Sequence, residues 1–279
     1  MNRPESLRNK VIVITGAGGV LCGEMAKELG RCGAKIAVLD LTKEKADAVA
    51  EEINKEGGCA KGYSCNVLDE EGLKAVHEAI NKDLGKIDIL LNGAGGNSPK
   101  ATTSEEYFTE DHEEGAISFF DLQKSGVEFV FDLNFMGTFL PTREFAKDMI
   151  GREGCSILNV SSMNAFTPLT KIPAYSGAKA AVSNFTKWLA VHFSKAGIRV
   201  NAIAPGFLVT GQNKALLFDE KGNPTARTKK ILAATPMNRF GDPKELLGAV
   251  KFLLDEEASS FITGVVLPID GGFSSYSGV

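Results

Sequence analysis

Val11-Ile12-Val13-Ile14-Thr15-Gly16-Ala17-Gly18-Gly19 is the stretch of this 279-residue chain that decides its fold class. Four consecutive apolar residues predict a buried strand, and the small residues after them predict a tight turn into a helix that contains Met25, Ala26 and Leu29. Glycines between a strand and a helix let the backbone approach a pyrophosphate, whose charge the helix N-terminus stabilises. Taken alone, the turn is also compatible with an ordinary tight connection, because a glycine-rich turn is a weak signal.

The rest of the chain alternates strands and helices in the same way. Further apolar runs predict strands at Lys35–Leu39, Gly62–Cys65, Ile87–Leu91, Ser156–Val160, Arg199–Ile203 and Val265–Ile269. Uninterrupted apolar strands separated by helices predict a parallel sheet that is covered on both faces. Right-handed crossovers then give an α/β fold, a Rossmann-like doubly wound sheet flanked by helices, with ligands bound beyond the C-terminal ends of the strands.

The sequence predicts a single domain over residues 1–279, since it contains no internal repeat, linker or low-complexity tract. Two stretches are irregular: an acidic insertion at 97–127, and a basic segment at 207–241. The second segment carries a balance of +4, although the whole chain has a net charge of −4. Its basic residues are Lys214, Lys221, Arg227, Lys229, Lys230 and Arg239, and its acidic residues are Asp219 and Glu220.

Composition narrows the class of protein. With 43% hydrophobic and 24% charged residues, the chain is typical of a soluble globule with a sizeable core. Its net negative charge argues against nucleic acid as a partner. No apolar run is long enough for a membrane span and no signal peptide precedes the first strand, so we expect a cytoplasmic location. Scattered cysteines and an acidic cluster around His112 lack ligand spacing, so no metal is expected.

Asp40 ends the second predicted strand, 24 residues after Gly16. A carboxylate there can accept hydrogen bonds from the ribose hydroxyls of an adenosine, and it would repel a 2′-phosphate, so it favours NAD over NADP. A solvated acid, or the N-cap of a helix that begins near Thr42, is the alternative interpretation. The stretch Asn92-Gly93-Ala94-Gly95 closes the fourth strand, where small residues would let a dinucleotide pass close to the backbone.

Tyr175 and Lys179 lie four residues apart in a predicted helix, so their side chains share one face. An ammonium group near a phenol lowers its pKa from about 10, which makes proton transfer to an alkoxide practical. The spacing is common in helices, and it becomes informative only beside a dinucleotide turn. Ser162, just past a strand, can hold a substrate oxygen beside the tyrosine. Asn134 lies early in the preceding long predicted helix, where it is also compatible with a simple polar flank.

This ordered set of residues resembles the short-chain dehydrogenase/reductase family, over essentially the whole chain. The resemblance rests on Thr15-Gly16, Asp40, Asn92-Gly93-Ala94-Gly95, Asn134, Ser161-Ser162, Tyr175 with Lys179, and Pro205-Gly206 followed by Thr210. It implies that Tyr175 is the general acid/base and that Ser162 orients the substrate oxygen. It also implies that Lys179 binds the nicotinamide ribose, that Asn134 supports a proton relay through water, and that the catalytic helix packs in a homo-oligomer, a dimer or tetramer.

The same resemblance implies NAD as the cofactor and a set of residues that bind it. They are Gly16, Gly18, Gly19, Val20, Leu21, Asp40, Leu41, Asn66, Val67, Asn92, Gly93, Ala94, Tyr175, Lys179, Pro205, Gly206, Phe207, Leu208 and Thr210. The chain departs from the family at two places. Val20 and Cys22 stand where the family usually has glycines, which puts the phosphate contacts of the turn in doubt. Asn66 stands where aspartate is frequent, which keeps a hydrogen-bonding group without its charge.

Within the family, the chain resembles the sugar-acid branch, the D-mannonate oxidoreductases or fructuronate reductases. The stretches that carry this resemblance are Ser162–Leu169, Ala204–Phe207 with Gln212-Asn213, Thr235–Met237 and Asp270–Val279. It implies hydride transfer between NAD and a hydroxyl or keto carbon of an anionic sugar acid, D-fructuronate or D-mannonate. The basic segment at 207–241, which covers the substrate in this family, agrees with a carboxylate, although a solvated charged loop has the same composition.

The candidate substrate residues are Ser162, Asn164, Gln212 and Asn213 for oxygen atoms and hydroxyls, with Lys171 or Arg227 for the carboxylate. Two other functions remain open. One is another polyol or keto-acid dehydrogenase, such as a gluconate 5-dehydrogenase. The other is a regulator that senses NAD without turnover. Such sensors tend to lose the catalytic tyrosine or lysine, whereas this chain keeps Asn134, Ser162, Tyr175 and Lys179.

Overall fold

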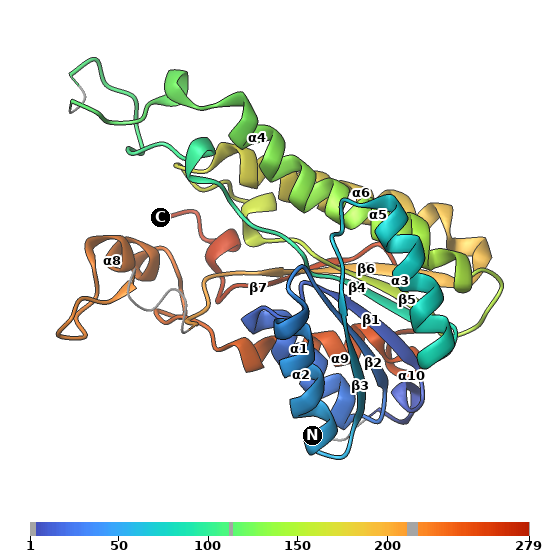
Figure 1. The fold of residues 1–279 in the computed structure, drawn as a ribbon. Coiled ribbons are helices and arrows are strands. Elements are labelled where there is room, and N and C mark those ends of the chain that lie inside the picture. The colour runs from blue at the N-terminus through green and yellow to red at the C-terminus, as the bar shows by residue number, and fades with distance from the viewer. Residues whose placement is uncertain (1–3, 112–113, 211–216, 279) are drawn as a thin grey trace.

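The computed structural model describes residues 4–111, 114–210 and 217–278. Its centre is a seven-stranded sheet in the order β3-β2-β1-β4-β5-β6-β7, and every neighbouring pair is parallel (Figure 1). The strands are β1 (Val11–Thr15), β2 (Lys35–Asp40), β3 (Cys59–Ser64), β4 (Ile89–Asn92), β5 (Cys155–Val160), β6 (Ile198–Pro205) and β7 (Val266–Ile269). The strand order reverses between β1 and β4, which is where a doubly wound sheet binds its ligand.

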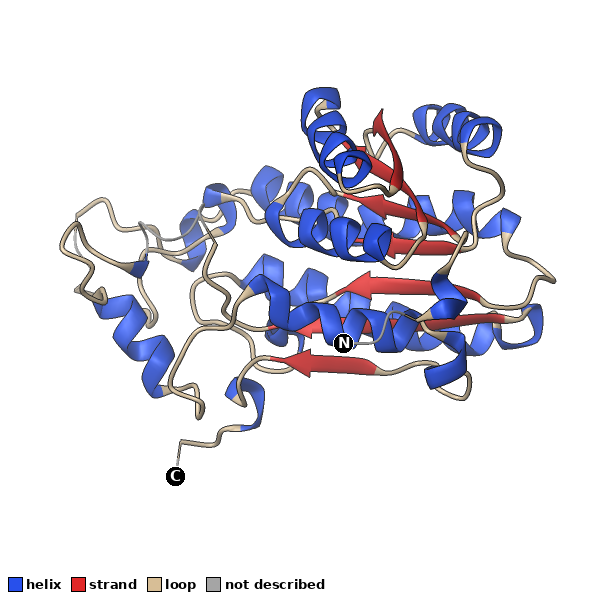
Figure 2. Cartoon of the chain, turned by 90° about the horizontal axis from the view of Figure 1, so that it is seen from below, coloured by secondary structure: helices blue, strands red, loops and turns tan. Residues whose placement is uncertain are grey.

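Helices cover both faces of the sheet (Figures 1 and 2). One face packs against α1 (Val20–Arg31), α2 (Lys43–Lys55) and α9 (Leu247–Leu254), and the other against α3 (Glu70–Asp83), α5 (Gly137–Phe145) and α6 (Pro173–His192). Ile12 and Ile14 of β1 belong to the first core, whereas Val11 and Val13 belong to the second. Successive strand residues point to opposite faces, so a strand buried on both sides must be apolar at every position.

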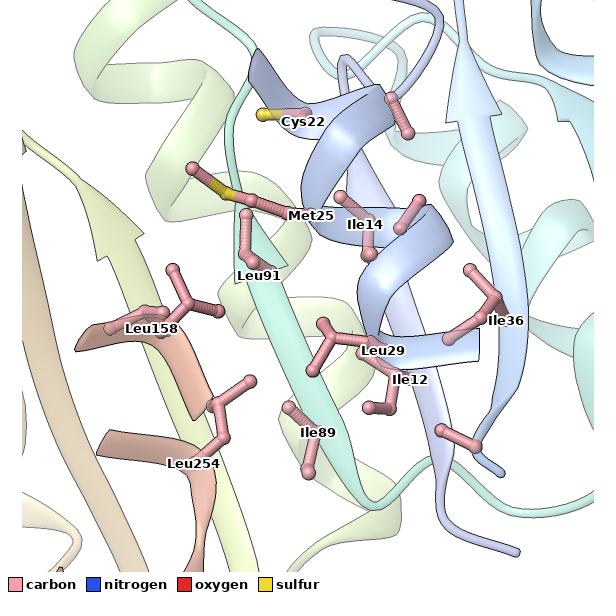
Figure 3. Packing of buried hydrophobic residues seen from close by; sticks show 14 of the residues in the cluster. Ile12, Ile14, Cys22, Met25, Leu29, Ile36, Ile89, Leu91, Leu158 and Leu254 are labelled. Atoms are coloured by element: carbon pink, nitrogen blue, oxygen red, sulfur yellow. The ribbon is translucent and has the colours of Figure 1, made fainter. Parts of the chain in front are cut away.

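The first core is built around α1. Met25 and Leu29 of this helix point toward Ile12, Ile14 and Leu91 of the sheet (Figure 3). The sequence predicted this helix from the turn at residues 15–19, and the predicted doubly wound fold is confirmed.

Every predicted strand is present, with small differences at the ends. The largest is β3, which begins at Cys59 rather than at Gly62. Cys59 and Lys61 are exposed on this edge strand, so hydrophobicity does not mark its first half.

The helix that carries Asn134 starts earlier than the sequence predicted. α4 (Lys124–Phe131) is followed by a π-helical turn at Asp132–Met136 and then by α5, so Asn134 lies in the middle of a helical run. The predicted insertion at 97–127 therefore ends within α4. A Cβ on Gly126, in the first turn of α4, would lie 2.6 Å from Cβ of Lys100, so the glycine serves close packing. Single π turns are frequent at functional sites.

The two irregular segments lie beyond one end of the sheet (Figure 1), and the strand arrowheads in Figure 2 point toward that end. The segment at 207–241 contains α8 (Ala226–Ala233), and its ends are tied together where Val209 N donates to Gly241 O at 3.1 Å. Lys230 of α8 forms an ion pair with Glu106 of the other segment, with Nζ and Oε1 2.8 Å apart. Among the residues that the structure describes, no helix has the length and apolarity needed to cross a membrane.

Candidate active site

The turn after β1 and the end of β4 are locked together at the point where the strand order reverses. Thr15 Oγ1 accepts hydrogen bonds from the backbone N–H groups of Gly93, at 3.0 Å, and Ala94, at 3.2 Å. Gly16 has a φ of +67°, and a Cβ on it would lie 2.9 Å from Cα of Ala94. Only glycine fits this position, because it needs both the left-handed conformation and the close approach of two backbones.

Asp40 lies against the same turn from the end of β2. Its Oδ2 accepts from Gly18 N at 3.1 Å, and its Oδ1 accepts from Thr42 N at 3.1 Å. A Cβ on Gly18 would lie 2.7 Å from Asp40 Oδ2, so a glycine is required beside the carboxylate. Thr42 does occupy the N-cap of α2, but its side chain makes no capping hydrogen bond. The alternative that Asp40 is this N-cap is therefore wrong.

The remaining residues expected at the adenosine end follow β2 and β3. Leu41 is exposed directly after Asp40, and Asn66 is exposed just past β3 with its Oδ1 accepting from Leu68 N at 3.0 Å. Cys65 N donates to Asp40 O at 2.8 Å, which keeps the two strand ends side by side. Val67 is buried, and a Cβ on Gly137 of α5 would lie 3.0 Å from its Cγ2.

A cavity of about 400 Å³ separates the start of α1 from the segment at 207–241. Its described lining includes Val20, Leu21, Gly206, Phe207, Leu208, Thr210, Leu217, Arg227, Ile231 and Phe240. The first six belong to the expected cofactor set. The first N–H groups of a helix have no acceptor within the helix, and the helix dipole places positive potential there. The residues present therefore fit the diphosphate of a dinucleotide, despite the two departures from the family's glycines.

Asn92 does not present its side chain to this edge of the sheet. Its Nδ2 donates to Thr142 Oγ1 and to Asn159 Oδ1, both at 2.9 Å, and Asn159 Nδ2 donates to Thr186 Oγ1 at 2.9 Å. The side chain of Asn92 is thus held inside the protein, and the prediction that a dinucleotide passes close to this stretch concerns its backbone. This buried polar chain links β4 and β5 to α5 and α6 and was not foreseen, although asparagines inside apolar strands were its visible signal.

The predicted catalytic side chains come together at the end of β5. The hydroxyl of Ser162 is hydrogen-bonded to that of Tyr175. Lys179 is buried, with its Nζ donating to Val160 O at 2.8 Å and lying 5.7 Å from the centroid of the Tyr175 ring. Ser161 Oγ donates to Lys179 O at 3.1 Å, which ties the first turns of α6 to the end of the strand.

Asn134 is fully buried, and its side chain is held by backbone groups. Its Nδ2 donates to Gly96 O and Val130 O, both at 2.7 Å, and its Oδ1 accepts from Gly96 N at 3.3 Å. A Cβ on Gly95 would lie 2.7 Å from Asn134 Oδ1 and 3.2 Å from Lys179 Nζ. The structure thus brings Asn134 and Lys179 together across Gly95, a residue that the predicted site did not include.

The candidate substrate residues are not all in one place. Asn164 is 4% exposed and its N–H donates to Ser162 Oγ at 3.3 Å, while its Oδ1 has no hydrogen-bond partner within the described residues. Lys171 lies on the loop between Asn164 and Tyr175, and its Nζ donates to Ser104 O. Arg227 instead lines the cavity at the start of α1, to which Ser162, Asn164 and Tyr175 do not contribute. Gln212 and Asn213 lie outside the described residues.

A family model of short chain dehydrogenases matches residues 10–221. The chain belongs to the short-chain dehydrogenase family. An uncharacterized oxidoreductase of Haemophilus influenzae is 64% identical over 274 residues, which cover 98% of this chain and 96% of the relative. The 5-keto-D-gluconate 5-reductase of Escherichia coli is 34% identical over 272 residues, 98% of each chain.

A solved structure agrees with this assignment. A Haemophilus influenzae protein with a provisional assignment as a D-mannonate oxidoreductase, crystallised with bound NAD, superposes with a TM-score of 0.96 at 64% identity, over 98% of each chain. The family resemblance and the fold inferred from the sequence are therefore confirmed, and the chain is an oxidoreductase.

Burial sets the protonation of the two central groups of this short-chain dehydrogenase. It raises the pKa of Tyr175, against the opposing effect of the hydrogen bond with Ser162, and it lowers the pKa of Lys179 to about 8. The sequence had predicted that Lys179 lowers the tyrosine pKa. In this structure burial raises the pKa of Tyr175 instead, and the ammonium group of Lys179 donates to Val160 O. Tyr175 is consequently a neutral phenol at pH 7, suited to give a proton to a carbonyl oxygen.

Proposed function

We propose that this short-chain dehydrogenase uses NAD to interconvert a keto sugar acid and its hydroxy acid, D-fructuronate and D-mannonate. The observation that carries the proposal is Asn164 Oδ1, a buried acceptor with no partner among the described residues, two positions from Ser162. A buried acceptor without a hydrogen bond costs free energy, which a polyhydroxylated substrate would recover. The relatives assigned to D-mannonate and 5-keto-D-gluconate chemistry support the same substrate class.

NAD, when bound, supplies the hydride for reduction and accepts it in oxidation. Asp40, Leu41 and Asn66 would hold the adenosine, the start of α1 the diphosphate, and Lys179 the nicotinamide ribose. Asp40 supports NAD rather than NADP, since its carboxylate lies at the end of β2 beside the glycine turn.

In reduction, Tyr175 donates its hydroxyl proton to the substrate oxygen as negative charge develops on that oxygen. Ser162 donates a second hydrogen bond to that oxygen and keeps it beside the phenol. Asn134 holds the Gly95–Gly96 backbone against Lys179, so its part is to position the lysine. In oxidation the same groups work in reverse, with Tyr175 accepting the proton of the substrate hydroxyl.

We assign the substrate carboxylate to Lys171 rather than to Arg227. Lys171 lies on the substrate side, on the loop between Asn164 and Tyr175, whereas Arg227 lines the cavity that faces α1. The ion pair of Lys230 with Glu106 and that of Arg239 with Glu245 reduce the positive charge that the segment at 207–241 can offer a substrate.

A screen of hexuronates, keto-aldonates and neutral ketoses with NADH tests the function. We expect D-fructuronate to be reduced faster than D-fructose, which has the same carbon skeleton length without a carboxylate. Asn164→Leu should lower kcat/KM for D-fructuronate while NADH binding stays near wild type. Activity confined to 5-keto-D-gluconate would replace the proposed substrate by the alternative one, and the absence of activity on every sugar acid would refute the substrate class.

We also propose that the chain forms a homodimer or homotetramer through α6. The exposed face of this helix carries Trp188, 57% exposed, and Val191, 77% exposed. The Trp188 ring stacks between those of Phe185 and His192, with centroids 6.2 and 4.6 Å apart. Exposed large apolar side chains that lie together on one face are typical of a protein interface. Trp188→Glu should give a monomer in light scattering, and the neighbouring Lys187→Glu should keep the wild-type mass; an unchanged mass for Trp188→Glu would place the interface elsewhere.

A further inference from the structure

The cavity beside α1 contains one charged side chain among its described lining residues, and that side chain is Arg227. The other described residues of the wall are apolar, glycine, or, in Thr210, hydroxylic. No acidic residue occurs in the first turn of α1, whose residues Val20 and Leu21 form the opposite wall. A helix N-terminus and a guanidinium group facing one cavity create a positive potential that selects an anion.

The geometry of α8 directs Arg227 toward this cavity. Arg227 and Ile231 are four residues apart on the helix, and both line the cavity, so one face of α8 is turned to it. Lys230 points elsewhere, since it pairs with Glu106.

The first turn of α8 is anchored to the chain before it. Thr225 caps the helix by accepting from Thr228 N, and Thr228 Oγ1 is buried and donates to Leu217 O at 2.6 Å. These contacts hold the backbone that carries Arg227 and leave its exposed guanidinium group available to a ligand.

We propose that Arg227 is a cofactor-binding residue whose guanidinium group pairs with the diphosphate of NAD from the side opposite α1. This inference rests on the use of NAD proposed above. Guanidinium groups form two parallel hydrogen bonds to phosphate oxygens, which suits a diphosphate held on its other side by backbone N–H groups. It replaces the expectation that Arg227 pairs with the substrate carboxylate.

The role has a structural consequence. Arg227 belongs to the segment that covers the substrate side, so a bound diphosphate would hold α8 over the site before the substrate arrives. NAD binding would thereby fix the position of α8 over the site. The ion pair of Lys230 with Glu106 would link the segment before α4 to the same position.

Direct binding measurements with fragments of the cofactor test the proposal. The ligands are NADH, ADP-ribose and adenosine, titrated calorimetrically into wild type, Arg227→Ala and Lys229→Ala. Lys229 is the matched control, because it lies on the same helix, is exposed, and does not line the cavity. We expect Arg227→Ala to weaken NADH and ADP-ribose on the order of 10-fold, the range of an exposed charge-assisted contact, and to leave adenosine unchanged.

Arg227→Lys, which keeps the charge without the planar fork, should recover part of the lost affinity. Arg227→Gln provides a second variant of similar size. Equal losses in Arg227→Ala and Lys229→Ala would reduce the effect to general charge and overturn the proposal. If Arg227→Ala leaves the NADH affinity unchanged and raises the KM for the sugar acid, Arg227 pairs with the substrate carboxylate and the proposal is wrong. Wild-type protein that binds no NADH would instead refute the proposed cofactor, so the two failures are distinguishable.

Discussion

Lys179 Nζ lies 5.7 Å from the centroid of the Tyr175 ring and donates its hydrogen bond to Val160 O at 2.8 Å. The two side chains are neighbours on one face of α6, yet burial moves their pKa values in opposite directions. The pKa of Tyr175 is raised from 10.0, and that of Lys179 is lowered from 10.5 to about 8. Between about pH 8 and 10, both groups are therefore neutral.

Tyr175→Phe removes the proton donor and keeps the ring. We expect turnover to fall by at least ~10²-fold, the lower end for a lost general acid/base, because phenylalanine has no proton to give to the substrate oxygen. NADH affinity should change little, and this serves as the control for folding. A variant that retains more than about a tenth of wild-type turnover between pH 6 and 9 would show that the tyrosine is not the acid.

The pH dependence should differ between the two directions of reaction. Tyr175 stays protonated through neutral pH, so reduction should be flat below about pH 8 and should decline above it as Lys179 loses its charge. Oxidation needs an unprotonated tyrosine, so its rate should still be rising at pH 9. Profiles of kcat/KM in both directions measure this. In Lys179→Met the inflection near pH 8 should disappear, and its persistence would assign it to another group.

Lys179→Met should raise stability while it lowers activity. The folded-state pKa is depressed, so the buried ammonium destabilises the folded state below about pH 8, and stability rises with pH from there to about 10.5. After allowance for the lost hydrogen bond to Val160 O, the variant should be more stable at pH 7 by about 1–3 kcal/mol. Urea denaturation at pH 7 and 9.5 measures the free energy of unfolding of both proteins. The variant should be the more stable one at pH 7, and its advantage over wild type should be smaller at pH 9.5. Lys187→Met, on the exposed side of α6, is the control; an equal gain there would contradict the burial argument.

Asp40 should decide between NADH and NADPH. A 2′-phosphate placed beside this carboxylate meets a like charge, so wild type should prefer NADH by at least about 100-fold in kcat/KM. Asp40→Asn removes the charge but keeps only one oxygen acceptor for the N–H groups of Gly18 and Thr42, so it should narrow the preference for NADH with a small loss of stability. Asp40→Ser should narrow it further. Equal use of both cofactors by the wild type would rule out this role.

The sequence by itself determined the layout of the fold and the chemistry-bearing positions. The central strands β1 and β4 are runs of apolar residues, as burial on both faces of a sheet requires. Thr15-Gly16, Asp40, Ser162 and Tyr175 stand at strand ends or at the start of a helix, so local spacing was enough to predict them. The sequence did not predict the first half of β3, because residues there are exposed on an edge strand, nor the start of α4, which lies inside the predicted insertion at 97–127.

Only the tertiary structure decided which way the side chains of the site face. Asn92 turns into the core, Lys179 turns to Val160 O, and Arg227 faces the start of α1 instead of Asn164. Each of these directions depends on a partner far away in the sequence, and the pKa of Tyr175 depends on the burial that those partners create. Spacing along one chain determines which residues share a helix face, whereas the partner on the other side of that face is set by how the elements pack.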